Sequence, residues 1–230
     1  MRFYVFACSI LLAPLIGARY TDEERPNRSL TVKTTSGTYT GFVNSAGPDV
    51  NQWIGIPYGR PPLGDLRFMP PKRAPDYGHA DAKSYKPICF QTGNRTGAFW
   101  ELMPEFQNTD SQSEDCLYLN IWGPRKPVQK KVPVIIWVCG GGFREGGGHA
   151  PYQVPDQWIQ RTQTHVVVTF KYMTSNYGLF ETSADLYIVS YRLGIFGFPN
   201  SPIANKNAGL LDIRLVYVST SQDKYISLFN

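Results

Sequence analysis

The sequence predicts an α/β fold in which helices pack against a mostly parallel sheet. Two apolar, β-branched runs, VPVIIWV (132–138) and THVVVTF (164–170), lack alternation, which is typical of strands buried on both faces of a parallel sheet. Between them, the mixed polar and apolar segment PYQVPDQWIQRTQ (151–163) predicts a crossover helix. Strand, helix and strand in this order indicate an α/β layered architecture. A third apolar run, IVSYRLGIFGF (188–198), predicts another strand.

The segments before this sheet predict a hairpin followed by coil. The stretch LTVKTTSGTYTGFV (30–43) places Thr and Val at alternating positions on both sides of a Ser-Gly pair, so two short strands joined by a turn are expected. The next stretch, WIGIPYGRPPLGDLRFMPPKRAPDYG (53–78), is dense in Pro and Gly. It predicts an ordered coil over the surface, because neither a helix nor a central strand tolerates that composition for long.

The first residues predict a secreted, extracellular protein. One Arg precedes an apolar run from Phe3 to Ile16, and the small residues Gly17 and Ala18 follow. This is the layout of a secretory signal peptide over 1–18, and cleavage is expected after Ala18. The run is shorter than the ~20 apolar residues that a membrane helix needs, and no other stretch approaches that length, so no transmembrane segment is expected.

Charge, glycosylation sequons and cysteines further narrow the class of protein that the sequence predicts. The net charge of +5 arises from 23 basic and 18 acidic residues that form no basic block, so a nucleic-acid partner is not expected. Two sequons, at Asn27 and Asn94, predict glycosylation. Three cysteines remain after the signal peptide, and the favoured pair is Cys89 with Cys116, with three free thiols as the alternative.

The stretch CGGGFREGGG (139–148), directly after the first buried run, is the strongest functional signal. A phosphate-binding loop would need Gly-Lys-Ser/Thr at its end, and a dinucleotide fingerprint would need a sixth-position Gly where Glu145 stands. Both alternatives fail on spacing. A flexible linker or an oxyanion hole remain, and in the latter bare backbone N–H groups stabilise the negative oxygen of an acyl-transfer intermediate.

The chain resembles the type-B carboxylesterase family, which also contains cholinesterases, fungal lipases and catalytically silent adhesion proteins. The matching motifs occur in the family's order and cover nearly all of the mature chain, which corresponds to less than half of a full member. They are GIPYGRPPLGDLRF (55–68), EDCLYLNIW (114–122), VPVIIWVCGGGF (132–143), YRLGIFGF (191–198) and NAGLLDIR (207–214). The resemblance implies an incomplete α/β-hydrolase fold: an N-terminal hairpin and the first part of the central, mostly parallel sheet.

The resemblance also implies roles for single residues. Gly141 and Gly142 correspond to the oxyanion donors, and Gly140 supports their turn. Cys89 and Cys116 correspond to a disulfide. Two salt bridges are implied near the site, the first joining Arg67 to Glu114 and the second joining Arg192 to Asp212. Cys139 stands where the family commonly has His or Tyr, and it is interpreted as a small buried residue that ends a strand.

The catalytic residues of the family are not found in this chain. Its members use a Ser in a GxSxG turn, a His base and an orienting acid, all of which lie beyond the region that this chain matches. The nearest alternative, Ser45 in NSAG, lacks the first Gly and is interpreted as a turn residue. His79, His149 and His165 have no surrounding motif of a general base and are interpreted as structural.

The sequence departs from the family in two segments. Residues 171–188 interrupt an apolar strand and predict an insertion, and residues 217–230 match nothing expected there. The expected domain is therefore 19–230, with both segments as translated intron or misread coding sequence.

The predicted function is that of a secreted carboxylic ester hydrolase acting on small-molecule or lipid esters, without metal or cofactor, and this chain is expected to be inactive alone. The alternatives are a non-catalytic binding or adhesion protein and a pseudogene product. Choline esters are not expected, because no Trp lies between Ile54 and Phe99 to hold a quaternary ammonium.

Overall fold

The computed structural model describes residues 30–91, 111–129, 131–139, 154–171, 191–200, 202–204 and 206–222. The elements in chain order are β1 Thr31–Thr34, β2 Gly37–Thr40, β3 Phe42–Asn44, β4 Gly47–Pro57, the 3-10 turn η1 Gly64–Leu66, β5 His79–Asp81, β6 Ile88–Cys89, β7 Gln112–Ser113, β8 Tyr118–Pro124, β9 Val134–Cys139, α1 Asp156–Thr162, β10 Val166–Lys171, α2 Gly194–Gly197 and α3 Ala208–Gln222.

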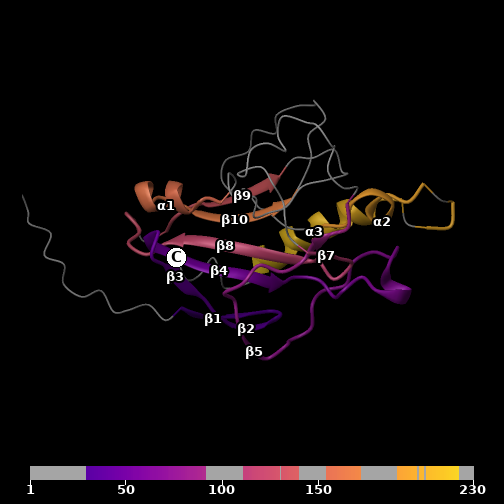
Figure 1. Cartoon of the computed structure of the whole chain (residues 1–230), viewed down its shortest axis with the longest axis horizontal. Coiled ribbons are helices and arrows are strands. Elements are labelled where there is room, and N and C mark those ends of the chain that lie inside the picture. Colours follow the sequence, from indigo (N-terminus) through magenta and orange to yellow (C-terminus); the bar gives the residue numbers. More distant parts are fainter. Residues whose placement is uncertain are drawn as a thin grey trace, which may run out of the picture.

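The main sheet has five strands in the order β3-β4-β8-β10-β9 (Figure 1). β10 and β9 run parallel in register from Val166↔Val134 to Lys171↔Cys139, and the other neighbours are antiparallel. The parallel pair confirms the two strands predicted from the apolar, β-branched runs. α1 confirms the predicted crossover helix, and its Ile159 is fully buried against the sheet.

Burial differs between the two parallel strands. Val166, Val167, Val168 and Thr169 of β10 are all buried, as expected of a strand covered on both faces. In β9 the side chain of Trp137 is 44% exposed. The reason is position, since β10 lies inside the sheet, whereas β9 is its last strand within the described part of the chain.

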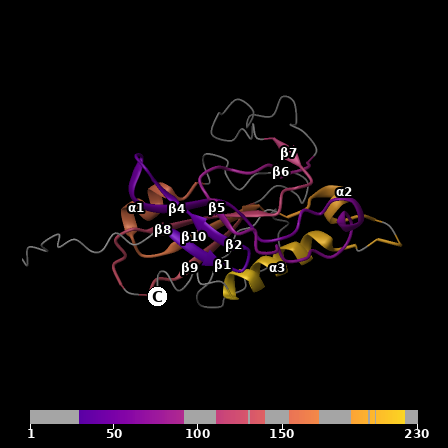
Figure 2. The same ribbon diagram turned by 90° about the horizontal axis from the view of Figure 1, so that it is seen from below.

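A smaller sheet in the order β1-β2-β5 contains the predicted hairpin. Gly37 begins β2 with φ 138°, a conformation that favours glycine, so the Ser-Gly turn behaves as predicted. Figure 1 shows β1, β2 and β5 beyond β4, on the side away from β9. Figure 2 shows α3 on one side of the main sheet and the short pair β6 and β7 on the other.

Two predictions about secondary structure were wrong. Residues 53–57, expected as coil, form the end of β4, because their backbone pairs with β8 as far as Pro57↔Tyr118. The apolar run expected as a third strand contains α2 instead. Its Arg192 directs its backbone N–H to the Asp212 carboxylate at 2.9 Å rather than to a strand, and Gly194 follows with φ 49°.

Candidate functional site

The carboxyl ends of β9 and β10 define the candidate site. The two strands end side by side at Cys139 and Lys171, and the glycine run follows β9 directly in the sequence. Ligands of open α/β sheets bind outside the carboxyl ends of parallel strands. The run therefore begins at the end of the sheet where this class of fold places its chemistry. Gly140, Gly141 and Gly142 themselves lie outside the described residues.

A buried ion pair joins Arg192, just before α2, to Asp212 in α3. Arg192 donates from Nε to Oδ2 at 2.9 Å and from Nη2 to Oδ1 at 2.8 Å, and the two side chains are 2% and 0% exposed. Burial raises the pKa of Asp212, while its hydrogen bonds to Arg192 act in the opposite direction. The pair satisfies both charges where water cannot, so it fixes the start of α2 against α3.

The same arginine reaches the segment around η1. Its Nη1 donates to the carbonyl oxygen of Arg67 at 2.7 Å. The side chain of Arg67 forms a bidentate pair with Glu114, with distances of 2.6 Å and 2.8 Å. Hydrogen bonding to Glu114 raises the pKa of Arg67, which stays charged. The structure thus brings together all four predicted charged residues, and links them in one chain from Glu114 to Asp212.

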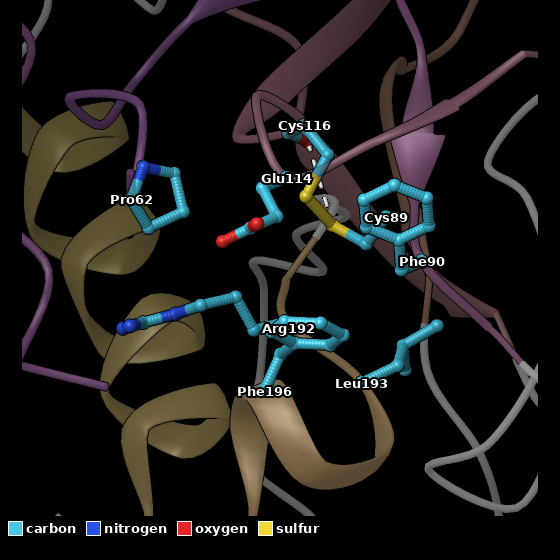
Figure 3. A pocket seen from close by; sticks show the side chains of 8 residues that line it. All are labelled: Pro62, Cys89, Phe90, Glu114, Cys116, Arg192, Leu193 and Phe196. Atoms are coloured by element: carbon cyan, nitrogen blue, oxygen red, sulfur yellow. Dashed lines mark hydrogen bonds between the residues drawn. A yellow bond between two sulfur atoms is a disulfide. The ribbon is translucent and has the colours of Figure 1, made fainter. Parts of the chain in front are cut away.

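A disulfide joins Cys89 in β6 to Cys116, two residues after Glu114 in the sequence. Figure 3 shows it at the edge of a small cavity, with Phe90 and Leu193 on one side and Pro62, Glu114 and Arg192 on the other. The cavity volume is about 10 Å³, which is roughly the space of one water molecule. This cavity is too small for an ester substrate.

Two further features of this region could not be predicted from the sequence. Tyr58 is buried beside the Arg192–Asp212 pair. Its pKa is raised mainly by burial and to a smaller extent by the charge of Asp212. The rings of Phe68 and Phe90 each stack on Phe196, with centroids 6.2 Å and 5.8 Å apart. Neither feature forms a local pattern, because the partners come from distant segments.

The alternative catalytic residues do not form a constellation. Ser45 is exposed in the turn between β3 and β4. His79 lies in β5, with Nε2 3.0 Å from the hydroxyl oxygen of Thr40. His165 is buried at the amino end of β10, the end opposite to Lys171, with its ring centroid 4.2 Å from that of Trp158. Burial lowers the pKa of His165, because it disfavours the charged imidazolium.

The remaining predicted features lie largely outside the described residues: the signal peptide 1–18, the sequons at Asn27 and Asn94, His149, and all of 171–188 except Lys171. Cys139 ends β9, and its side chain is not described. In the tail, α3 continues to Gln222. In the described ranges no three His, Cys, Asp or Glu side chains are grouped as metal ligands. No described helix has the length and apolar character of a membrane span.

Comparisons with known proteins agree on one family. Residues 28–188 match the carboxylesterase family. The chlorogenic acid esterase of Aspergillus niger is 39% identical over 192 residues, covering 81% of this chain and 34% of that protein. Secreted lipase 5 of Gibberella zeae is 33% identical over 233 residues, covering 90% of this chain and 40% of that protein. The acetylcholinesterase of Bungarus fasciatus is 37% identical over 198 residues, covering 81% of this chain and 28% of that protein.

A solved structure supports the same fold. A thermophilic PNB esterase superposes with a TM-score of 0.65 at 28% identity, covering 85% of this chain and 35% of the esterase. The chain thus spans roughly a third of the length of its curated relatives. Its architecture is part of an α/β-hydrolase fold. The chain belongs to the carboxylesterase family.

Proposed function

We propose that this chain is the N-terminal portion of a secreted carboxylic ester hydrolase. The observation that carries the proposal is the parallel register of β9 and β10, whose last pair is Cys139 and Lys171. The glycine run follows β9 directly in the sequence, so it starts at the carboxyl end of the parallel strands, outside which the ligands of such sheets bind. Relatives of this chain are named for hydrolysing esters and lipids, which supports small-molecule or lipid esters as the substrate class.

In the proposed reaction, a serine hydroxyl attacks the ester carbonyl carbon, and the carbonyl oxygen becomes an oxyanion. The N–H groups of Gly141 and Gly142 donate hydrogen bonds to that oxyanion, while Gly140 permits the turn. Loss of the alcohol leaves an acyl-enzyme, which water then hydrolyses. This chain supplies the oxyanion donors and the ion-paired supports. The serine, its base and the acid would come from sequence beyond it, so the chain alone is expected to be inactive.

The proposed organisation follows from the same interpretation. Residues 1–18 are removed as a signal peptide, 19–230 belong to the hydrolase domain, and Asn27 and Asn94 carry glycans. Residues 171–188 form an insertion and 217–230 a divergent tail. N-terminal sequencing of the secreted product should begin at Arg19, and enzymatic deglycosylation should lower its apparent mass.

The first experiment is to sequence the mature transcript past the codon for Val216. An in-frame GxSxG downstream, with 171–188 spliced out, supports the hydrolase. A downstream frame in which the serine is replaced favours a binding protein, and a transcript that reads as given favours a truncated product. Fluorophosphonate labelling of the 230-residue chain is expected to fail, and capture at a serine would contradict the claim that it is inactive alone.

A second experiment addresses the oxyanion donors in the complete product. Gly141→Pro removes one N–H and should lower kcat about 10²- to 10³-fold with little change in KM. Gly148→Pro is the matched control, since it places the same substitution in the second glycine run. Equal losses in both variants would contradict the role assigned to Gly141.

A further inference from the structure

A second cavity lies between the small sheet and the paired ends of β4 and β8. Its volume is about 210 Å³, below the roughly 300–1,000 Å³ of drug-sized pockets, and it therefore has room for a single ring. Its walls include Tyr39 from β2, Tyr77 before β5 and Tyr118 from β8. β4 is three strand steps from β9 in the main sheet, about 14 Å at the usual strand spacing. The β4 wall of the cavity is thus well separated from β9.

Two of the tyrosine walls are fixed by their hydroxyl groups. The hydroxyl of Tyr39 donates to the carbonyl oxygen of Ser36 at 2.8 Å, and that of Tyr118 donates to Oδ1 of Asp115 at 2.9 Å. Burial is the main cause that raises the pKa of Tyr118, and the hydrogen bond to Asp115 raises it further, so the side chain stays a neutral phenol. Rings held in this way lose little freedom when a ligand packs against them.

The uncompensated charge in the cavity comes from Lys86. The other charged lining residue, Asp81, is paired with Lys83 at 3.0 Å. Among the ion pairs of the described residues, Lys86 has no carboxylate partner. A lining of mostly apolar walls with one unpaired ammonium group favours a ligand that is itself apolar and carries one negative charge.

The Lys86 side chain lies close to the backbone of β4 at Gly55. The register of β4 against β8 shifts between Ile54 and Ile56, and Gly55 within this bulge has φ 81°. A β-carbon at Gly55 would lie 2.8 Å from Cγ of Lys86 and 2.5 Å from the carbonyl oxygen of Ser84. Bulges redirect side chains at binding sites. Here the bulge and its glycine leave the space through which the lysine stem passes.

We propose that this tyrosine cavity binds a single aromatic ring bearing a carboxylate, with the ring against the tyrosine walls and the carboxylate on the Lys86 ammonium group. Aromatic rings pack favourably on tyrosine faces, and a charge-assisted contact fixes the orientation of the ligand. A cationic ligand would meet Lys86 and be repelled, and a neutral sugar would leave that charge unused.

Calorimetric titration of the full chain with 4-hydroxybenzoate tests the proposal. Two comparators separate its parts: 4-hydroxybenzyl alcohol has the ring without the charge, and cyclohexanecarboxylate has the charge without the aromatic ring. Saturable binding of the probe, about fivefold or more tighter than either comparator, is expected. Absence of saturable binding, equal binding of a comparator, or tighter binding of methyl glucoside would overturn the proposal.

Variants locate the binding in the cavity. Lys86→Gln should weaken binding of 4-hydroxybenzoate about fivefold or more, and Lys86→Arg should retain that binding. Tyr77→Ala should weaken the binding of 4-hydroxybenzoate and of 4-hydroxybenzyl alcohol alike. Lys33→Gln, an exposed lysine of β1 outside the cavity, is the matched control and should bind as the parent chain does. Equal affinity of Lys86→Gln and Lys33→Gln would overturn the assignment. In the parent chain, added salt should weaken the binding of 4-hydroxybenzoate and leave the binding of 4-hydroxybenzyl alcohol unchanged. The opposite result would also overturn the proposal.

Discussion

Removal of the carboxylate of Asp212 should destabilise the chain more than any single exposed substitution. Asp212→Leu deletes three hydrogen bonds to Arg192, from the backbone N–H, Nε and Nη2. It leaves a guanidinium that is 2% exposed without a counter-charge. Breaking one side of a buried pair costs about 3–5 kcal/mol. This is a large share of the roughly 5–15 kcal/mol that a domain has in total.

The double variant separates charge from packing. Arg192→Met with Asp212→Leu removes both charges, so no buried ion is left unpaired. Its remaining costs include the backbone N–H of residue 192, which loses its acceptor on Asp212, and the carbonyl oxygen of Arg67, which loses its 2.7 Å donor, at about 1–3 kcal/mol each. The double variant should therefore be more stable than Asp212→Leu and less stable than the parent chain.

The assay is equilibrium unfolding in urea, followed by tryptophan fluorescence, with midpoints compared at a common slope. Lys83→Ala is the control, because its pair with Asp81 has side chains 47% and 64% exposed and should contribute about 0–1 kcal/mol. An Asp212→Leu chain within about 1 kcal/mol of the parent, or a double variant less stable than the single one, would refute the reasoning.

Three further predictions concern stability. Cys89→Ser with Cys116→Ser opens a loop with a sequence separation of 27 and should cost about 3.5 kcal/mol by the chain-entropy relation; an unchanged urea midpoint would contradict this. Burial lowers the pKa of His165, so its unfolded form binds protons more readily. The unfolding free energy should fall as the pH drops below about 6.5, less steeply in His165→Gln, and equal slopes would exclude this histidine. Gly55→Ala, at φ 81° with a carbonyl oxygen 2.5 Å from the new β-carbon, should cost more than about 1 kcal/mol. Gly64→Ala, at φ 52° in open space, should cost less, and the reverse order by denaturation would argue against the close contact.

Local pattern was enough to predict β10 and α1. The run Val166–Val168 predicted β10 because every side chain in it is apolar and β-branched, and the mixed polar and apolar segment before it predicted α1. Family motifs anticipated the pairing of Arg192 with Asp212. Local pattern failed at α2, because the backbone of Arg192 is satisfied by a side chain 20 residues later. It also gave no sign of the tyrosine cavity, whose walls come from β2, β8 and the segment before β5.

The contact between Arg192 and the carbonyl oxygen of Arg67 has a consequence for the timing of biosynthesis. The two residues are 125 positions apart in the chain. At translation rates of 5–20 residues per second, the ribosome needs about 6 to 25 s to add that length. Until then the segment around η1 lacks one of the donors that anchor it, and contacts of such long range also slow folding itself. The segment around η1 therefore depends, during synthesis, on a residue that emerges 125 positions later.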